Sequence, residues 1–323
     1  MADGDRFSAA AVRQAAQRIA GHVKRTPVLT NATLDDRAGA QVFAKAEPLQ
    51  RSGSFKARGA FNRLLQLSGD ERRRGIVAYS SGNHGAAVAT AAAELEIPAV
   101  IVAPHSAPEA KLGQMKALGA ELVWYDPACD DRVAIATGIA AERGLTLIPP
   151  FDDLDVMAGQ GTLALELIED AGPLDLLLVP VSGGGLLAGV GTMARELCPE
   201  VRLIGVEPAA GDDTARSLRA GRRVRLDATP ETIADGLRVP EPGELTFAVN
   251  RRLLERVVTV EEDEIVEAMR FCFEQLKLVV EPSGAVALAA LLTKRVEAPG
   301  ARIGIVLSGG NVDAARFTTL LAK

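Results

Sequence analysis

The sequence predicts an α/β protein with two lobes, each an open, mainly parallel sheet with flanking helices. From Gly75 onward, short apolar runs alternate with longer Ala-rich amphipathic runs, which is typical of parallel strands joined by crossover helices. The chain has 323 residues, of which 48% are hydrophobic, so it can bury a substantial core. Pro149 and Pro150 separate two such series and indicate a hinge between the lobes.

The first series extends to residue 148, and we expect residues 75–152 to form a small domain. Its apolar runs have the length of strands and its Ala-rich runs have the length of helices. They follow one another as strand Gly75–Tyr79, helix His84–Leu95, strand Pro98–Ala103, helix Pro108–Leu118, strand Glu121–Tyr125, helix Arg132–Arg143 and strand Leu145–Ile148.

The second series begins at Met157, and we expect residues 1–74 and 153–323 to form a large domain. A polar, Arg- and Pro-rich stretch, Gly211–Gly243, interrupts the alternation. The elements expected are helix Ala164–Glu169, strand Leu174–Val181, helix Leu186–Leu197, strand Val201–Glu207, helix Glu262–Lys277, helix Ser283–Thr293, strand Arg302–Leu307 and helix Asp313–Leu321.

Charge and cysteine content exclude several classes of protein. The net charge of −6 argues against a nucleic-acid or membrane-surface binder, which needs a basic surplus. Cys129, Cys198 and Cys272 are odd in number and far apart, so we expect buried free thiols in a reducing cytoplasm. The N-terminal residues lack a signal-peptide pattern, and no apolar run is long enough to span a bilayer.

Lys56 is the first candidate for chemistry. It follows Ser52, Gly53 and Ser54 at a predicted helix start and lies among apolar residues. Burial disfavours the charged ammonium, and a neutral amine is the form that makes a Schiff base. The alternative is that the ammonium simply extends into water, as it does for most lysines beside apolar residues.

Three loops after predicted strands carry polar groups and glycines. Ser80–Gly85 has two hydroxyls, an amide and an imidazole; one serine could instead serve only as a helix N-cap. Val181–Leu186 contains a glycine run that suits a phosphate at a helix N-terminus. Ser308–Asn311 suits a ring nitrogen or an anion, although a simple turn is its alternative. Such loops form ligand sites at the carboxyl ends of parallel strands.

The second loop also matches a dinucleotide-binding pattern. Gly183, Gly185 and Ala188 have the spacing of that fingerprint, and Glu207 ends the next predicted strand at about 20 residues' distance, as the pattern requires. A nicotinamide-dependent dehydrogenase is therefore an alternative for this loop, but it gives no role to Lys56.

Taken in order, the motifs resemble the fold-type II pyridoxal-phosphate enzymes, whose fold is similar to the tryptophan synthase β subunit. The resemblance is to the branch of threonine/serine dehydratases and serine racemases, and it spans nearly the whole chain. The segments that carry it are residues 52–60, 80–85, 158–162, 183–185, 281–284 and 308–311.

The resemblance implies that pyridoxal 5′-phosphate is bound covalently by Lys56, next to Phe55, and that Lys56 also takes the α-proton. Ser182 stands where the family often has a further glycine, and its N–H can still bind phosphate. The other implied contacts are Asn83 at the ring hydroxyl, the backbone of Gly183, Gly184, Gly185 and Leu186 at the phosphate, and Ser308 at the pyridine nitrogen.

The resemblance also implies a small amino-acid substrate. Ser81 corresponds to the second acid/base of the racemases, but it equally offers a donor for the substrate carboxylate. Arg132 could receive a distal carboxylate, as in hydroxyaspartate, or could be an exposed helical arginine. The residues implied at the substrate carboxylate are Ser80, Ser81, Gly82, Asn83 and His84.

A divalent-cation site is implied at Glu207, Gly211 and Asp213. Two carboxylates and a backbone carbonyl suit Mg²⁺, and also Ca²⁺ or Mn²⁺. The alternative is that Asp212 or Asp213 merely caps a short helix over residues 214–218.

The function expected from these features is a threonine/serine dehydratase that releases a 2-oxo acid and ammonia. The neutral hydroxyl of Ser308 favours elimination over transamination, and residues 151–153 and 232–238 are similar to the dehydratases. Serine racemase and 3-hydroxyaspartate dehydratase are the alternatives. A non-catalytic amino-acid sensor and the dehydrogenase are more remote. We expect a homodimer or homotetramer.

Overall fold

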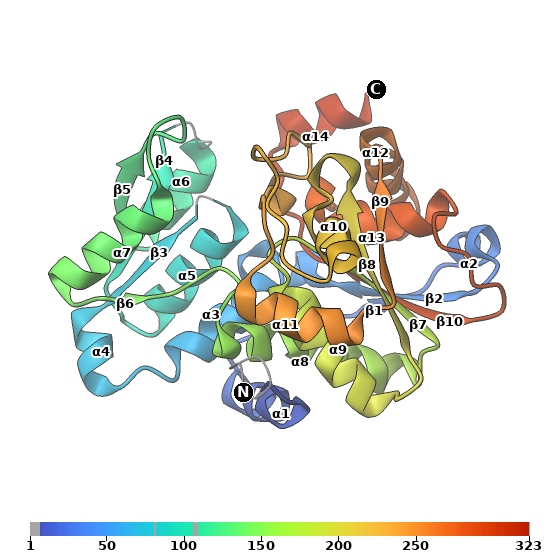
Figure 1. Cartoon of the computed structure of the whole chain (residues 1–323), viewed down its shortest axis with the longest axis horizontal. Coiled ribbons are helices and arrows are strands. Elements are labelled where there is room, and N and C mark those ends of the chain that lie inside the picture. The colour runs from blue at the N-terminus through green and yellow to red at the C-terminus, as the bar shows by residue number, and fades with distance from the viewer. Residues whose placement is uncertain (1–6, 81, 106–108, 323) are drawn as a thin grey trace.

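The computed structural model describes residues 7–80, 82–105 and 109–322, with the backbone alone for residues 109–111. Figure 1 shows two sheets side by side, each flanked by helices. The predicted α/β class with mainly parallel sheets is confirmed. The division of the chain at residues 74 and 153 stays a prediction.

The smaller sheet has the order β5-β4-β3-β6, and all its strands are parallel. From β3 onward its strands and helices alternate as predicted, with bounds that differ by a few residues, whereas α4 was not predicted. They are α4 Gly69–Arg74, β3 Ile76–Tyr79, α5 Asn83–Glu94, β4 Ala99–Pro104, α6 Glu109–Ala117, β5 Glu121–Tyr125, α7 Arg132–Arg143 and β6 Thr146–Leu147.

The larger sheet has the order β1-β2-β10-β7-β8-β9, in which only the β1–β2 pair is antiparallel. Its strands are β1 Val28–Leu29, β2 Gln41–Ala46, β7 Leu176–Pro180, β8 Arg202–Pro208, β9 Arg256–Val260 and β10 Arg302–Leu307. The helices around it are α1 Ala9–Arg18, α2 Ala32–Ala38, α8 Leu154–Ala171, α9 Gly185–Leu197, α10 Asp213–Ala220, α11 Glu244–Leu253, α12 Glu262–Phe271, α13 Pro282–Leu292 and α14 Ala314–Leu321. Helix α3, Lys56–Leu64, packs on α8 at Gly59, while its buried apolar side chains belong to the core of the smaller sheet.

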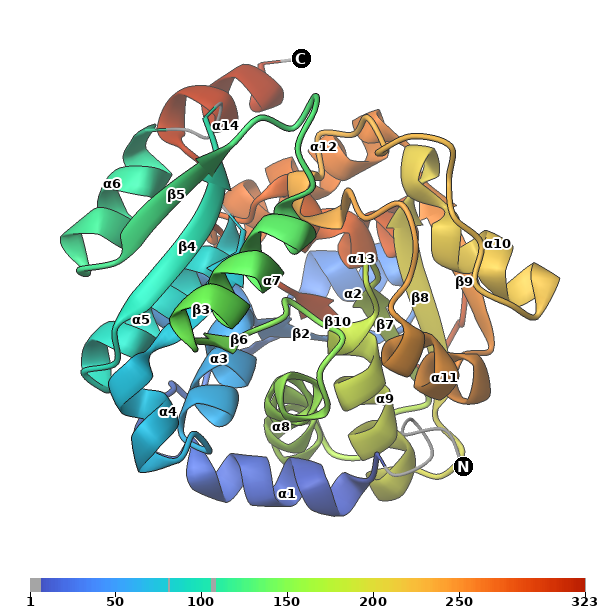
Figure 2. The same cartoon turned by 60° about the vertical axis from the view of Figure 1, so that its left-hand side comes forward.

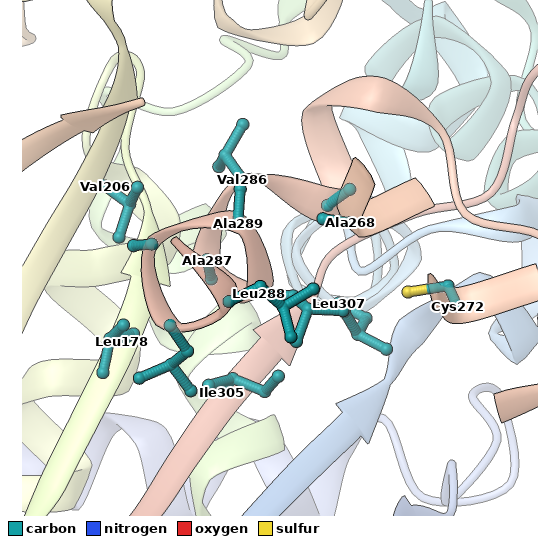
Figure 3. Packing of buried hydrophobic residues seen from close by; sticks show 14 of the residues in the cluster. Leu178, Val206, Ala268, Cys272, Val286, Ala287, Leu288, Ala289, Ile305 and Leu307 are labelled. Atoms are coloured by element: carbon teal, nitrogen blue, oxygen red, sulfur yellow. The ribbon is translucent and has the colours of Figure 1, made fainter. Parts of the chain in front are cut away.

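Side-chain alternation along the central strands builds a three-layer core. Leu176 and Leu178 of β7 pack with α12 and α13, whereas Leu177 and Val179 pack with α8 and α9, because successive residues of a strand face opposite sides. Figure 3 shows α13 residues such as Leu288 beside Ile305 and Leu178. In Figure 2, α1 runs across the base of the molecule below α8.

Some elements differ from the prediction. Helix α8 begins ten residues before the predicted Ala164, because its glycines serve close packing rather than a turn. A Cβ at Gly159 would lie 2.5 Å from Arg58 O, and one at Gly161 would lie 2.7 Å from Gly189 O. The predicted helix Glu262–Lys277 ends as an α-helix at Phe271 and continues as a π-helical turn, Cys272–Leu276. Helices α1, α2 and α11 and strands β1, β2 and β9 were also not predicted.

The cysteine prediction was only partly right. All three thiols are free, and Cys198 and Cys272 are buried, but Cys129 is exposed in the turn between β5 and α7. None of the helices in the described chain combines the length and apolar character of a membrane span.

Candidate functional site

Lys56 is the first residue of α3, as predicted, and its amine is partly buried. Nζ donates a hydrogen bond to Pro150 O at 2.6 Å and lies 5.1 Å from the centroid of the Phe55 ring. No described carboxylate forms an ion pair with it. Burial lowers the pKa of Lys56 from 10.5 to about 8, so a substantial fraction of the amine is neutral at physiological pH.

The turn before Lys56 is joined to the loop that follows β10. Phe55 N donates to Ser308 O at 3.1 Å, and Gly310 N donates to Gly53 O at 2.9 Å. Ser54 and Gly309 form a bridge between the two segments. Ser308 is therefore held next to the Lys56 turn, and only 4% of its surface is exposed.

Asn83, the first residue of α5, is joined to the loop after β10 and to the start of α13. Its Nδ2 donates to Glu281 Oε1 at 2.5 Å, and its Oδ1 accepts from Asn311 Nδ2 at 2.7 Å. Asn311 Nδ2 also donates to Ser52 O at 2.7 Å. The Lys56, Asn83 and Ser308 motifs, far apart in the sequence, thus meet in space.

His84 is buried beside these groups in its neutral form. The contact of its Nε2 with Ile148 O, 2.9 Å away, makes Nε2 the protonated nitrogen, since a carbonyl can only accept. Burial lowers the pKa of His84 to about 3, and the nearby Lys56 charge adds to the effect. Nδ1 is a buried acceptor without a partner among the described residues.

The rest of the Ser80–Gly85 loop is described apart from Ser81, which lies outside the described residues. Gly82 occupies the N-cap of α5, and no side chain among the described residues caps that helix, so Ser80 does not serve as the helix cap. Ser80 Oγ instead accepts from Gly82 N at 3.2 Å.

The glycine loop between β7 and α9 forms a cradle at a helix N-terminus. Gly184 has φ of +93°, which glycine adopts at little cost. A Cβ at Gly183 would lie 2.4 Å from the Phe151 ring. In the described chain, the N–H groups from Gly183 to Leu186 donate to no protein acceptor, and Ser182 Oγ is buried without a partner.

The predicted cation site brings Glu207 and Asp213 together at the end of β8. Glu207 accepts from Thr214 N and Ala215 N, both at 3.1 Å, so Glu207 caps α10. The alternative that Asp212 or Asp213 provides this cap is wrong. Gly211 lies in the 3₁₀ turn between the two carboxylates. Across the described residues, no three His, Cys, Asp or Glu side chains form a metal-binding cluster.

The pKa values of these two carboxyls are raised. Burial raises the pKa of Asp213 to about 7. It raises that of Glu207 well above its ordinary value, and the Asp213 charge adds to this rise. The Glu207 carboxylate faces α10 rather than the glycine loop, so it is not placed as the ribose-binding acid of a dinucleotide site.

Arg132 begins α7 and is exposed. Burial raises the pKa of Tyr79, the last residue of β3, and the charge of Arg132 opposes this rise, so Arg132 is close to Tyr79. Arg132 therefore lies on the side of the smaller sheet from which the Ser80–Gly85 loop leaves.

Several groups at the site had no signal in their local sequence. The sequence indicates only a hinge at Pro150, yet the Pro150 carbonyl accepts from Lys56. Asp152 caps α11, a helix that was not predicted, by accepting from the N–H groups of residues 244–246. Thr246 and Asn250 of that helix contact the glycine loop.

These residues fit pyridoxal phosphate, the cofactor that the resemblance implies. A partly neutral lysine amine suits covalent attachment. Unsatisfied N–H groups at the start of α9 suit a phosphate. The Ser308 hydroxyl lies on a segment bonded to the Lys56 turn, and the Asn83 amide is connected to that turn through Asn311. Both are neutral groups, which suit a ring nitrogen and a ring hydroxyl.

Comparisons with known proteins agree with this chemistry. The model of the family described as pyridoxal-phosphate dependent enzyme matches residues 19–309. The chain is 48% identical to an L-threo-3-hydroxyaspartate ammonia-lyase of Pseudomonas sp, over 96% of this chain and 97% of that protein. It is 46% identical to one from Saccharomyces cerevisiae, over 96% and 95%. The solved structure of maize serine racemase superposes with a TM-score of 0.92 at 41% identity, over 98% of this chain and 97% of that one.

Proposed function

Because this chain belongs to the fold-type II pyridoxal-phosphate-dependent enzymes, as its motifs predicted, we propose that it is an L-threo-3-hydroxyaspartate ammonia-lyase. The observation that carries the proposal is the near full-length similarity to two proteins of that activity. This alternative from the sequence is better supported than the threonine/serine dehydratase that we ranked first.

The reaction would convert a β-hydroxy amino acid into a 2-oxo acid and ammonia. The pyridoxal group, when bound, withdraws electrons from the α-carbon of an amino acid. Lys56 Nζ, with its pKa near 8, suits removal of the α-proton at physiological pH. Loss of the β-hydroxyl as water leaves an enamine, which takes up water to give oxaloacetate and ammonia from hydroxyaspartate.

Arg132 is the proposed partner of the distal carboxylate. Its position near Tyr79 lies next to the Ser80–His84 loop, the proposed site of the α-carboxylate. Guanidinium and carboxylate form charge-assisted, bidentate hydrogen bonds. Serine and threonine lack a second carboxylate, so this contact would favour hydroxyaspartate over both.

The test compares substrates and one matched pair of variants. Ammonia and 2-oxo acid are measured with L-threo-3-hydroxyaspartate, L-threonine and L-serine, and kcat/KM should be highest for the first. Arg132→Ala should lower kcat/KM for hydroxyaspartate by roughly 30-fold, the effect of losing a charged hydrogen bond, with a much smaller loss for L-serine.

Arg143→Ala is the control, because Arg143 lies at the far end of α7 and is ion-paired with Glu121. It should leave the substrate preference unchanged. A higher kcat/KM for L-serine or L-threonine than for hydroxyaspartate would contradict the proposal. If Arg132→Ala lowered kcat/KM equally for all three substrates, Arg132 would not be the partner of the distal carboxylate.

Serine racemisation is the second candidate, favoured by the similarity to maize serine racemase. It requires an acid/base on the face opposite Lys56, and Ser81 is the residue proposed there. D-serine formed from L-serine, and lost in Ser81→Ala while elimination persists, would establish this second activity.

A divalent cation, Mg²⁺ for example, is proposed at Glu207, Gly211 and Asp213. Two adjacent buried carboxylates are costly when both are ionised, and a bound cation offsets that cost. The role proposed for the cation is structural, because the Glu207 carboxylate engages α10.

A further inference from the structure

Helix α11 packs directly on the glycine loop. Thr246 is 0% exposed and Asn250 is 1% exposed, so both polar side chains are removed from solvent. A Cβ at Gly184 would lie 2.6 Å from Asn250 Nδ2 and 2.9 Å from Thr246 Oγ1. The loop thus approaches this helix as closely as glycine allows.

The two side chains bind consecutive carbonyls of the loop. Thr246 Oγ1 donates to Gly183 O at 2.5 Å, and Asn250 Nδ2 donates to Gly184 O at 3.0 Å. Gly243 N, just before the helix, donates to Gly183 O as well, at 3.2 Å. Gly184 O also accepts from Ala188 N of α9 at 2.9 Å, so contacts from α11 and α9 together fix the orientation of two successive peptide planes.

The directions of these two carbonyls determine the directions of the N–H groups that follow them. In a trans peptide the carbonyl of one residue and the N–H of the next point in opposite directions. With Gly183 O turned toward Thr246, Gly184 N–H points away from α11. Because Gly184 O is turned toward Asn250, Gly185 N–H also points away from α11. Both N–H groups are therefore free on the side opposite α11.

The position of α11 is itself fixed at its first turn. Asp152 accepts from Glu244 N, Leu245 N and Thr246 N at 3.0, 2.9 and 3.1 Å. A carboxylate at a helix N-terminus also interacts favourably with the helix dipole. Phe151, the residue before Asp152, packs against Gly183 and Gly185, so the same short segment contacts both the loop and the helix.

We propose that Thr246 and Asn250 are positioning residues for the cofactor phosphate. By holding the carbonyls of Gly183 and Gly184, they aim the N–H groups of the cradle at the phosphate without touching it. This inference rests on the proposed placement of the phosphate at the glycine loop.

Cofactor affinity with and without the phosphate tests the proposal. Dissociation constants of the cofactor-free protein are measured by equilibrium dialysis for pyridoxal phosphate and for pyridoxal. Thr246→Val should weaken binding of pyridoxal phosphate roughly 10-fold, the effect of one lost hydrogen bond, and Asn250→Ala should do the same. Neither should change pyridoxal affinity by more than about 3-fold, since pyridoxal makes no use of the cradle.

Three controls make the outcomes distinct. Thr246→Ser keeps the hydroxyl and should bind pyridoxal phosphate like the unaltered protein. Thr293→Val removes a hydroxyl that donates to Ala289 O at the end of α13 and should also have no effect. Circular dichroism identifies folded variants, and Asn250→Ala is an independent test should Thr246→Val not fold.

Equal loss of affinity for both ligands would overturn the proposal, because it would indicate a general structural role. Unchanged affinity for pyridoxal phosphate in both variants would overturn it too. Unaltered protein that binds both ligands equally would show that the cradle does not hold the phosphate. These results are separate from the substrate assays, so failure of the ammonia-lyase proposal would be seen independently.

Discussion

The Lys56 amine is partly buried, and its hydrogen-bond acceptor is an uncharged backbone carbonyl. The amine donates to the carbonyl of Pro150, which carries no full charge and therefore favours the ammonium less than a carboxylate would. Burial outweighs this contact and sets the direction of the pKa shift. A carboxylate in the place of this carbonyl would have the opposite effect.

The lowered pKa makes a prediction about reactivity in the cofactor-free protein. The rate of reductive methylation of Lys56 by formaldehyde should rise with pH and reach half its maximum at about pH 8, because only the neutral amine attacks an aldehyde. Mass spectrometry of the Lys56 peptide measures this rate. In urea the midpoint should move toward the ordinary value of 10.5; a folded midpoint at that value would contradict the buried amine.

The sequence could predict the residues of the site that lie in contiguous motifs. Lys56, Asn83 and Ser308 each occur in a loop with several polar residues and glycines. Their partners could not be predicted in the same way. Pro150 acts through its carbonyl, which every residue has, and Thr246 is 63 residues from the glycine that it contacts.

At the scale of elements, helix α10 is capped from the preceding strand. Glu207 of β8 binds the first N–H groups of α10, while Asp213 lies at its first residue. Two carboxylates consequently meet at a helix N-terminus, and the partial positive charge there offsets only part of their repulsion. Asp213 Oδ2 is buried and has no hydrogen-bond partner among the described residues.

Cation binding should therefore stabilise the protein in a pH-dependent way. At a Mg²⁺ concentration about 100-fold above its dissociation constant, Tm should rise by roughly 5 °C over the value in EDTA. The increment should grow as pH rises through about 7, where Asp213 loses its proton, since only the carboxylate binds the cation. Differential scanning calorimetry measures it.

Asp213→Asn should abolish this increment. The matched control is Asp212→Asn, because Asp212 is ion-paired with Arg216 on the outer side of α10. Loss of the increment in the control but not in Asp213→Asn would place the cation elsewhere. No increment with Mg²⁺, Ca²⁺ or Mn²⁺ would argue against any cation at this site.

Three of the elements that sequence patterns missed share one cause. Helix α11 and strand β9 lie between residues 244 and 260, where arginines and glutamates interrupt the apolar pattern. Strand β2 contains Lys45, which is 0% exposed but reads as a solvent-facing residue. Their burial depends on partners that are distant in the sequence, and no local periodicity encodes such partners.

Across the whole molecule, a buried charge network joins segments around the larger sheet. Arg58 of α3 donates to both oxygens of Glu47 and both of Glu166, at 2.7–2.9 Å. Lys45 of β2 contacts Glu166 at 2.6 Å, and Thr26 donates to Glu47 at 2.6 Å. The two positive charges, of Arg58 and Lys45, balance the two negative charges of the glutamates. Arg58 lies only two residues from Lys56.

Removing one charge of this network should lower the free energy of unfolding strongly, whereas removing one positive and one negative charge together should lower it less. Arg58→Met leaves the buried Glu47 and the partly buried Glu166 with Lys45 alone, so the free energy of unfolding should fall by about 3–5 kcal/mol. Glu166→Gln should also destabilise. The double variant, Arg58→Met with Glu166→Gln, restores the balance between Lys45 and Glu47, and it should be more stable than the sum of the single changes predicts, by about 1–3 kcal/mol.

Urea unfolding of the cofactor-loaded protein, followed by circular dichroism, measures these differences. The matched control is Arg25→Met, since Arg25 binds Glu169 and Asp170 of the same helix α8 with 51% of its side chain exposed. Exposed pairs contribute at most about 1 kcal/mol, so this variant should change stability little. If Arg58→Met cost no more than Arg25→Met, the buried network would not hold α3 against α8, and the position of Lys56 would have to depend on the Phe55–Ser308 contact instead.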